Sequence, residues 1–498
     1  MKKKISSILI VIILIATTLF SISRNQNVVS QEINPITSSI DQGNLIREFE
    51  VQDLLGNLRD ITNNKKDGIC NSFLRILSSK IQSDKKTYHK DLEWEQVVDE
   101  GFGDKDNTIA WSMEEYNGYL YVGTRTDVKK CQIYRSPTGD KGTWEKVILD
   151  GFDINFPSDG VRNMIVYKDL LWAVTDSWEF GSQVFVTNGE YGDNDSILNW
   201  KKANENGFGK GNIIQSSRSL RVYKNKLYIG ARSNENPLVY RYNGDTNFDN
   251  IQPENWSIIN QDMLDNKDHN PLLVLPGMMM NFTSNDGKEY LYLGIYEEPI
   301  PLLEEFIRTQ KIIYLLKFLN YPLWKSEIWR YNGSSWEKAV EDGFGNINVA
   351  AISAQVLNNT LYFGTSNIIG IEIWKTIDGK NWTQIAKRGL GQPFTMWCWR
   401  MHTFENRLIF GTFNILRGCQ IWASTSNNPK TNKDFIQINI DCMGNNDDPF
   451  LVKQDGVRSF EVFKGHLYAG TAAFMDFLIK QQKGSGCEVW RIPKIFGI

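Results

Sequence analysis

The sequence contains little of what most catalytic and metal-binding sites are made from. Only 4 of its 498 residues are histidines and 6 are cysteines, and no Cys-x-x-Cys pair occurs, which argues against a zinc or thioredoxin-like site. The chain also lacks a basic excess, because 55 basic and 58 acidic residues leave a net charge of −3. Nucleic-acid-binding domains are normally strongly basic, so we expect no nucleic-acid partner. No Walker loop, Rossmann fingerprint or Ser-His-Asp order is visible, and we expect no cofactor.

Aromatic side chains are abundant instead. They make up 12% of the residues, with 16 Trp and 19 Tyr, in a chain that is 41% hydrophobic and 23% charged. This composition is typical of a globular protein rather than a disordered one. Because aromatic rings pack well on pleated surfaces, it favours β-structure.

The N-terminal residues 1–23 have the layout of an export signal, with three lysines before an apolar run and small residues at Ser21 and Ser23. The apolar run is also nearly long enough to be an uncleaved membrane anchor. Both alternatives place the rest of the chain outside the cytosol, secreted or anchored. Residues 24–93 follow as a polar segment with apolar positions at helical spacing, which predicts a helical stalk or cap.

The strongest signal is an internal repeat that starts at Trp94. Similar segments begin at seven aromatic residues: Trp94, Trp144, Trp200, Trp256, Trp336, Trp382 and Phe435. A period of about 40–50 residues is typical of β-propellers. Each segment contains a glycine turn such as GFG at 101, an alternating strand that ends on an aromatic, a strand such as YLYVGT at 119, and a strand such as CQIYRS at 131.

Four short strands per repeat, joined by turns such as Asn-Gly, predict antiparallel sheets. The chain begins with an outer strand at Trp94 and ends with three inner strands at 457–492. We therefore expect an all-β fold over residues 94–498, a seven-bladed β-propeller with four antiparallel strands per blade. The N-terminal strand at Trp94 would join the last blade and close the ring.

This pattern resembles the kelch-type β-propellers, whose repeats also combine an Asn-Gly turn, a strand ending in glycine and a W-x-x-V strand. The resemblance covers residues 94–492, but the Gly-Gly pair of kelch repeats is Gly-Thr or Gly-Ala here. The segments SPTGDKGTW at 136 and TIDGKNW at 376 also resemble the Asp-box turns of sialidase-like propellers. Propellers include both enzymes and binding proteins, so neither resemblance fixes an activity.

Counting back five residues from the residue that ends each inner strand, an aromatic in six repeats and Leu357 in the fifth, gives one equivalent position per repeat. These positions hold Trp111, Arg162, Arg218, Gly277, Ile352, Trp399 and Arg458, and we expect them near the mouth of a central channel. Arginine offers a fork of donors to carboxylate or phosphate, and tryptophan offers a flat stacking face. We therefore predict that an anionic or sugar ligand is bound by five of these residues: Trp111, Arg162, Arg218, Trp399 and Arg458. The alternative is a purely structural role, in which the arginines donate hydrogen bonds to backbone carbonyls of the adjoining blades.

A long insertion at 297–325 interrupts the fourth repeat, and Leu302 to Leu319 is predicted to be helical. Its apolar residues, and those of the corresponding loop of the seventh repeat, are candidates for docking to a protein partner or a membrane surface: Leu302, Leu303, Phe306, Ile313, Leu316, Phe318, Phe474 and Phe477. The same residues would also suit a lid packed onto the blades, or a lid over a small-molecule site.

Two further predictions concern cysteines and metals. Cys419 opens the third strand of the sixth repeat and Cys442 closes its fourth, which would make them neighbours, and we predict a disulfide between them.

Asp and Asn are frequent in the glycine turns, but no stretch matches an EF-hand and turns favour these residues anyway. We therefore expect no metal.

The sequence as a whole favours a non-catalytic extracytoplasmic propeller. It would bind a ligand, a protein or glycan partner, or a membrane surface on its insertion-bearing face. The alternative is a sialidase-like or other propeller glycoside hydrolase. Such an enzyme would use Arg162, Arg218 and Arg458 together with a Tyr–Glu pair and an acid.

Overall fold

The structure is a computed structural model, and it describes residues 92–297 and 325–495 with short gaps. The gaps are at 127–129, 193–196, 234, 270–272, 341, 347–349, 368–369, 393–394, 415–416, 445–451 and 474–483. The predicted signal or anchor at 1–23, nearly all of the segment 24–93 and nearly all of the insertion 297–325 lie outside the described residues. The described residues all belong to one compact unit, which comprises residues 87–298 and 322–498.

The described chain is all-β, as predicted, and its strands pair antiparallel. The strands form seven groups of four, which we call quartets 1 to 7. Quartet 1 contains β2 (Asn107–Tyr116), β3 (Tyr119–Thr126), β4 (Ile133–Ser136) and β5 (Glu145–Lys146); quartet 2 contains β6 (Gly160–Tyr167), β7 (Leu170–Asp176), β8 (Val184–Tyr191) and β9 (Leu198–Lys202); quartet 3 contains β10 (Ile214–Tyr223), β11 (Lys226–Ser233), β12 (Pro237–Tyr242) and β13 (Trp256–Ile258).

The remaining quartets repeat this order. Quartet 4 contains β14 (Leu275–Thr283), β15 (Glu289–Tyr296), β16 (Glu327–Tyr331) and β17 (Trp336–Val340); quartet 5 contains β18 (Ala350–Leu357), β19 (Thr360–Ser366), β20 (Ile373–Thr376) and β21 (Thr383–Ala386); quartet 6 contains β22 (Thr395–Phe404), β23 (Arg407–Asn414), β24 (Gln420–Ser424) and β25 (Phe435–Gln437). Quartet 7 contains β26 (Gly456–Phe463), β27 (His466–Ala472), β28 (Val489–Ile492) and, from the other end of the repeat region, β1 (Glu95–Val98).

Helices are few and short within the described residues. The α-helices are α4 (Gln261–Leu264) and α7 (Asp342–Gly345), and the 3-10 helices are η1 (Asn206–Gly209), η2 (Gly211–Ile213), η3 (Phe248–Asn250), η5 (Arg388–Gly391), η6 (Asn432–Asp434) and η7 (Asp441–Gly444). No helix in the described part of the chain is long and apolar enough to cross a membrane.

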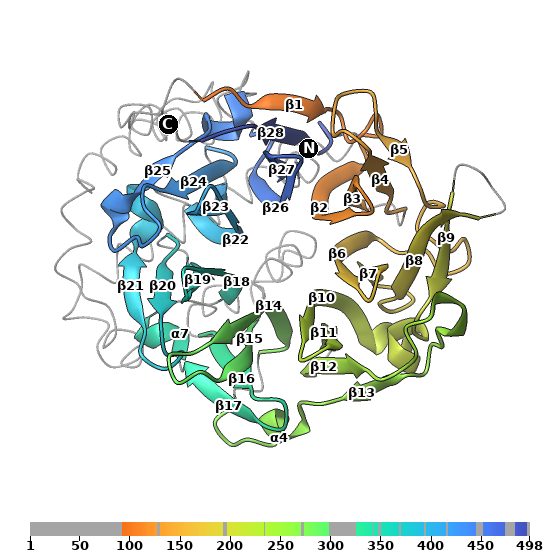
Figure 1. The fold of residues 1–498 in the computed structure, drawn as a ribbon, viewed down its shortest axis with the longest axis horizontal. Helices are drawn as coiled ribbons and strands as arrows, with labels where there is room; N and C mark the ends of the chain where they lie inside the picture. Colours follow the sequence, from red (N-terminus) through yellow and green to blue (C-terminus); the bar gives the residue numbers. More distant parts are fainter. Residues whose placement is uncertain are drawn as a thin grey trace, which may run out of the picture. The chain divides into compact units, whose positions relative to one another are not determined.

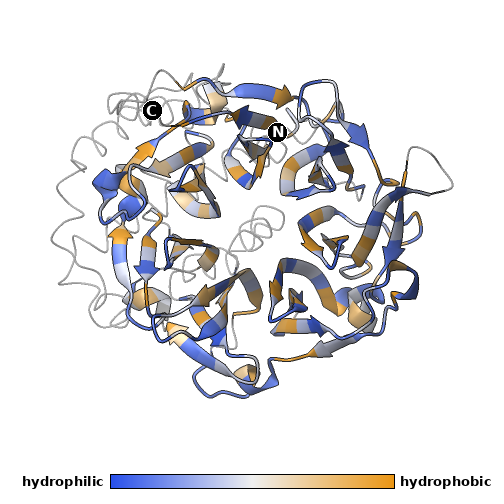
Figure 2. Ribbon diagram, viewed as in Figure 1, coloured by the Kyte–Doolittle hydropathy of each residue, from blue (hydrophilic) through white to orange (hydrophobic). Residues whose placement is uncertain are grey.

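Consecutive quartets contact each other through their first strands. The contacts run from β2 to β6, β10, β14, β18, β22 and β26, and β26 contacts β2 in turn. Figure 1 shows these first strands facing a common centre, with the later strands of each quartet further out. In Figure 2, hydrophobic and hydrophilic positions alternate along many of the strands, as expected for sheets that bury at least one face.

Glycine in the second strand allows the quartets to approach closely. A Cβ atom on Gly123 would lie 2.6 Å from the Cβ of Val161 in quartet 2, and one on Gly411 would lie 2.6 Å from the Cβ of Val457 in quartet 7. Beside Gly123, Ser112 donates a hydrogen bond to the Val161 carbonyl over 2.9 Å. Strand glycines commonly mark close backbone approach, and here they explain the glycine of YLYVGT and its repeats.

The glycine turns place an aromatic ring between neighbouring quartets. Phe102 has a left-handed backbone (φ 65°), which costs about 1–2 kcal/mol for a residue with a Cβ. Its ring stacks on Tyr134 at 4.1 Å between centroids and meets the edge of Trp144 at 5.6 Å. Phe152 and Phe208 repeat this arrangement in the next two quartets. Aromatic packing and burial offset the backbone strain.

Four of the tryptophans that open repeats bond to the preceding quartet: Trp94, Trp200, Trp256 and Trp336. The indole N–H of Trp256 donates to the Ala203 carbonyl over 2.7 Å, and that of Trp94 donates to the Ile438 carbonyl over 2.8 Å. Trp94 therefore links to quartet 6 as Trp256 links to quartet 2. This position agrees with the pairing of β1 with β28.

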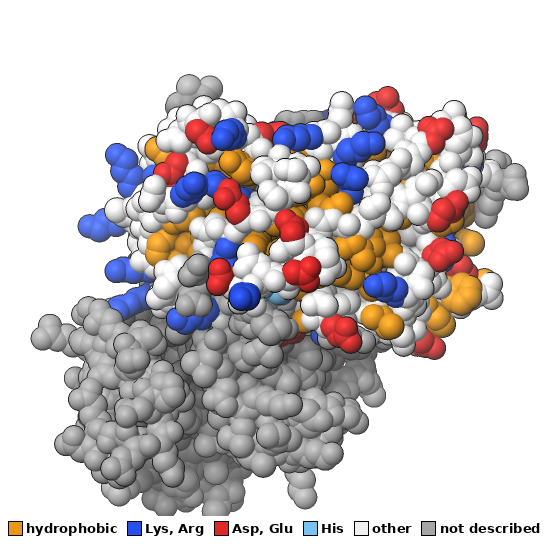
Figure 3. All heavy atoms as spheres, turned by 90° about the horizontal axis from the view of Figure 1, so that it is seen from below, with side chains coloured by type: hydrophobic (Ala, Val, Ile, Leu, Met, Phe, Trp, Pro, Cys, Tyr) orange, Lys and Arg blue, Asp and Glu red, His pale blue; other side chains and the backbone are white. Residues whose placement is uncertain are grey.

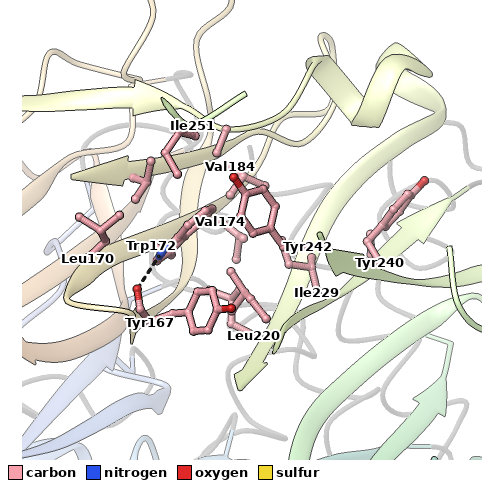
Figure 4. Close-up of a cluster of buried hydrophobic side chains, with 14 of the residues drawn as sticks. Tyr167, Leu170, Trp172, Val174, Val184, Leu220, Ile229, Tyr240, Tyr242 and Ile251 are labelled. Carbon is pink, nitrogen blue, oxygen red and sulfur yellow. Dashed lines mark hydrogen bonds between the residues drawn. The ribbon is translucent and has the colours of Figure 1, made fainter. Parts of the chain in front are cut away.

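The hydrophobic core is distributed between quartets. The cluster in Figure 4 joins quartets 2 and 3 and includes the fully buried Trp172, whose indole N–H donates to the Tyr167 carbonyl over 3.2 Å. The turns that resemble Asp boxes also connect quartets. Asp140 of the first such turn lies 2.7 Å from Nη1 of Arg491 in quartet 7.

Substitution of Val97 tests the packing of β1. Val97 is 1% exposed and belongs to a core cluster with residues of quartets 1 and 7. Val97→Ala removes two buried methyl groups and should lower the free energy of unfolding by about 2 kcal/mol. Urea denaturation measures the loss, and Glu93→Ala, at an exposed position just before β1, is the control. Equal stability of the two variants would contradict the observed position of β1.

Candidate functional site

The seven equivalent positions of the first strands share one structural feature. The register of each first strand shifts at this position, as between Ala110 and Ser112 around Trp111, or between Val457 and Ser459 around Arg458. The same shift occurs around the other five positions, which hold Arg162, Arg218, Gly277, Ile352 and Trp399. A β-bulge leaves one residue outside the ladder and redirects its side chain. The seven side chains can therefore differ without changing the strand pairing.

Four of these residues form a continuous arrangement that we call the Arg–Trp row. It consists of Trp399, Arg458, Trp111 and Arg162, from quartets 6, 7, 1 and 2. The guanidinium carbon of Arg458 lies 4.6 Å from the ring centroid of Trp399 and 5.7 Å from that of Trp111. The guanidinium carbon of Arg162 lies 4.0 Å from the Trp111 ring. Cations and aromatic faces thus alternate, and each such contact contributes about 0.5–2 kcal/mol.

Two glycines make room for the tryptophans of the row. Gly160 and Gly456 have ordinary backbone angles, but a Cβ atom on either would collide with the indole ring of Trp111 or Trp399, respectively. Both glycines lie in the sequence Asp-Gly-Val-Arg, at 159–162 and 455–458. This repeated motif therefore supplies both the arginine of the row and the space for the tryptophan beside it.

Arg218 has a different environment from the row. It is 7% exposed and donates from Nη1 to the hydroxyl of Tyr296 in quartet 4 over 2.6 Å. The remaining equivalent positions carry no charge. A Cβ on Gly277 would lie 2.7 Å from the Ala351 carbonyl oxygen, and Ile352 is 8% exposed. Four of the five predicted ligand-binding residues thus contact one another in the Arg–Trp row. The fifth, Arg218, instead contacts Tyr296.

A second set of equivalent positions was missed in the sequence. It lies at the end of each second strand, two residues after the close-approach position, and holds Arg125, Asp176, Arg232, Tyr296, Ser366, Phe413 and Ala472. Asp176 Oδ2 lies 3.5 Å from Arg162 Nη1, and Arg125 lies 5.5 Å from the Trp111 ring. Counting two residues forward from the glycine of YLYVGT and its repeats would have found six of these residues; in β7 the residue two before Asp176 is Val174.

A further set of polar residues lies along the first strands beyond the row. Arg400 Nη1 and Asn163 Nδ2 lie 3.0 and 3.9 Å from the sulfur of Met278. These residues come from quartets 6, 2 and 4, so three non-adjacent first strands meet here. Glu114 and Glu461, from quartets 1 and 7, accept hydrogen bonds from the backbone N–H groups of Val166 and Val462.

The environment of these carboxyl groups favours their neutral form. Burial, reinforced by the charge of Glu461, raises the pKa of Glu114 to about 8. Burial also raises the pKa of Glu461 to about 7, although Arg400 opposes the shift. Burial lowers the pKa of His402 to about 4. At neutral pH we therefore expect Glu114 to be largely protonated and His402 to be neutral.

A hollow of about 560 Å³ lies at the hairpins of quartets 5 and 6. It is lined by Val356, Leu357, Asn358, His402, Thr403, Phe404, Glu405, Asn406 and Val462. None of the predicted ligand-binding residues lines it. The hollow is therefore separate from the Arg–Trp row.

The structure corrects the predicted disulfide. Cys419 and Cys442 are neighbours, since the N–H of Cys442 donates to the Cys419 carbonyl over 3.1 Å, but both thiols are free and buried. Cys442 has a left-handed backbone (φ 56°), and its sulfur accepts a hydrogen bond from the Gln454 N–H over 3.1 Å. The turn geometry thus directs the Cys442 thiol toward Gln454.

Other predicted residues are not tested by the structure. The docking residues Leu302, Leu303, Phe306, Ile313, Leu316, Phe318, Phe474 and Phe477 all lie outside the described residues, and docking stays a prediction. Among the residues that are described, no group of three or more His, Cys, Asp or Glu side chains could hold a metal ion.

Replacement of Glu114 tests its protonation. The Glu114 carboxyl has a pKa of about 8 in the folded protein and about 4.5 in the unfolded chain. Between these pH values the folded protein keeps a proton that the unfolded chain loses. The free energy of unfolding therefore falls as the pH rises from about 4.5 to 8. Glu114→Gln should match the wild type at pH 5 and exceed it by about 1–3 kcal/mol at pH 8.5. Urea denaturation at both pH values measures the difference, and Glu115→Gln, at an exposed position, is the control. A pH-independent difference would contradict the elevated pKa.

Comparisons with known proteins do not assign a family. No family model matches the chain, and no curated protein matches it. Its fold is similar to the crystal structure of the polysaccharide lyase Uly1 (TM-score 0.44, 10% identity, 82% of this chain and 94% of that one), to AofleA from Arthrobotrys oligospora (0.41, 10%, 70% and 89%) and to a puromycin-hydrolyzing peptidase of Mycobacterium tuberculosis (0.45, 7%, 78% and 52%). With TM-scores below 0.5, these similarities support neither a family nor an activity for this chain.

Proposed function

We propose that the seven quartets are the blades of one kelch-like β-propeller, closed by the insertion of β1 into quartet 7. The antiparallel pairing of Glu95 with Arg491 supports this proposal, as does the contact between the first strands of quartets 7 and 1. We also propose that the protein works outside the cytosol, secreted or held by its N-terminal segment, as the layout of residues 1–23 suggests.

We infer that the protein binds an acidic glycan at the Arg–Trp row without catalysing a reaction. The observation that supports this inference is the alternation of two arginines and two tryptophans across four consecutive quartets. A guanidinium group pairs with a carboxylate through two parallel hydrogen bonds. An indole face suits the apolar face of a sugar ring, and a ligand with both features is a glycan that contains carboxylated sugars.

The surface charge favours a local rather than a general attraction for anions. The net charge of the chain is −3. On the face seen in Figure 3, basic and acidic side chains are interspersed with hydrophobic ones. An acidic ligand would therefore be recognised at a defined site and not by a broadly basic face.

Binding to a glycan array tests this function. Wild-type protein should retain uronic-acid oligosaccharides and not neutral ones, and Arg162→Ala or Arg458→Ala should weaken retention about ten- to a hundredfold, the effect of losing one charged hydrogen-bonded contact. Arg241→Ala is the matched control, because Arg241 lies on the third strand of quartet 3 and bonds to Asn243. Unchanged retention by both row variants would refute the proposal.

The contact between Arg218 and Tyr296 favours a second candidate, a glycoside hydrolase. A sialidase-like site needs a tyrosine beside arginine, and the Tyr296 hydroxyl lies 2.6 Å from Arg218 Nη1. If the protein cleaves bound glycans, Tyr296→Phe should lower the rate of reducing-sugar release at least about a hundredfold while binding persists. Retention of glycans by the wild type without any release would exclude this candidate.

A further inference from the structure

Exposed apolar side chains gather beside one end of the Arg–Trp row. Among the described residues, nine large hydrophobic side chains are exposed, and five of them lie in the connections that lead into β6, out of β7 and into β10: Leu149, Ile154, Phe156, Trp178 and Ile213. Trp178 is 41% exposed and Phe156 is 43% exposed. These connections adjoin quartet 2, which contributes Arg162 to the row.

Trp178 is held in a fixed position relative to the row. It follows β7 by two residues, and β7 ends at Asp176, whose carboxylate lies 3.5 Å from Arg162. The backbone N–H of Trp178 donates to Oδ2 of Asp159 over 2.9 Å, and Asp159 precedes Arg162 in the Asp-Gly-Val-Arg motif. The backbone of Trp178 is thus held two residues from Asp176, the residue whose carboxylate lies beside Arg162.

Arg232 and Trp178 repeat the contact seen in the row. The guanidinium carbon of Arg232 lies 5.3 Å from the Trp178 ring. Nε and Nη1 of Arg232 are buried and have no hydrogen-bond partner among the described residues. Buried donors without acceptors are unfavourable, and a carboxylate that entered beside Trp178 would supply one.

A third contact of this kind lies further along the same connections. Lys202 Nζ lies 5.6 Å from the ring of Phe156, which meets the edge of Phe180 at 5.6 Å. The hydroxyl of Ser177, next to Trp178, donates to the carbonyl of Pro157, next to Phe156, over 3.2 Å. The two exposed aromatic residues therefore belong to connected loops.

We propose that Trp178, Arg232, Phe156 and Lys202 form an outer subsite that binds additional units of an elongated acidic polysaccharide. This inference rests on the proposed glycan binding at the Arg–Trp row. Successive pairs of one cation and one aromatic ring match a ligand in which a charged sugar unit is repeated. A compact ligand would need only the row.

Affinity as a function of ligand length tests the outer subsite. Oligogalacturonides of two and eight units are titrated into the full chain, with binding measured by calorimetry. The wild type should bind the octamer more tightly than the dimer, and Trp178→Ala should weaken binding of the octamer about tenfold, as expected for one stacking contact, without changing binding of the dimer. Phe156→Ala, at a second exposed position, should act in the same direction.

The controls separate this inference from the function on which it rests. Ile440→Ala replaces an exposed apolar residue (62% exposed) next to quartet 6 and should leave both affinities unchanged, whereas Arg162→Ala should weaken both ligands. Equal binding of dimer and octamer by the wild type, or an unchanged octamer affinity in Trp178→Ala and Phe156→Ala, would overturn the outer subsite and leave the row intact. Failure of the wild type to bind either oligomer would overturn both.

Discussion

The close approach of neighbouring quartets is the constraint on which the rest of the structure depends. It is achieved where a second-strand residue without a side chain faces the next first strand, as Gly123 faces Val161. Hydrogen bonds from serine hydroxyls, such as Ser459 to the Ala110 carbonyl over 2.7 Å, fix the distance. Because the first strands are so close, side chains from different quartets can contact each other, as Arg458 and Trp111 do.

Further out, the same quartets are held by larger groups. Phe102 fits between Tyr134 and Trp144, and Trp94 donates its indole proton to the Ile438 carbonyl. Burial of aromatic rings supplies most of the free energy there, whereas the inner contacts set the geometry. The candidate site lies at the inner contacts, where few atoms are free to move.

Much of the fold could be predicted from the sequence because its signals are local and repeated. The alternation of apolar residues, the Asn-Gly turns and the tryptophans predicted the strands and their antiparallel pairing. The count of five residues back from an aromatic also found the bulge positions, since Tyr167 and Phe463 end their strands at the same distance from Arg162 and Arg458.

The side-chain contacts of the site could not be predicted in the same way. The ring on which an arginine stacks depends on how far neighbouring quartets are shifted relative to each other. The spacing of residues within one repeat does not indicate this shift. Asp176 and Tyr296 were missed because they end the second strands of their quartets, β7 and β15, whereas the count started from the end of the first strands. The disulfide prediction assumed that Cys442 closes the fourth strand, but β25 ends at Gln437. Cys442 lies in η7 with a left-handed backbone and a free, buried thiol.

The bulges have a consequence for how such a protein can diversify. A residue outside the ladder hydrogen bonds can be exchanged without breaking a strand pair, so six of the seven positions can mutate independently of the scaffold. The exception is Gly277, where a Cβ atom would lie 2.7 Å from the Ala351 carbonyl oxygen. The present set of two tryptophans, three arginines, one glycine and one isoleucine is then one combination among many. Descendants of this chain could acquire new specificities through single replacements at those positions while inheriting an unaltered framework.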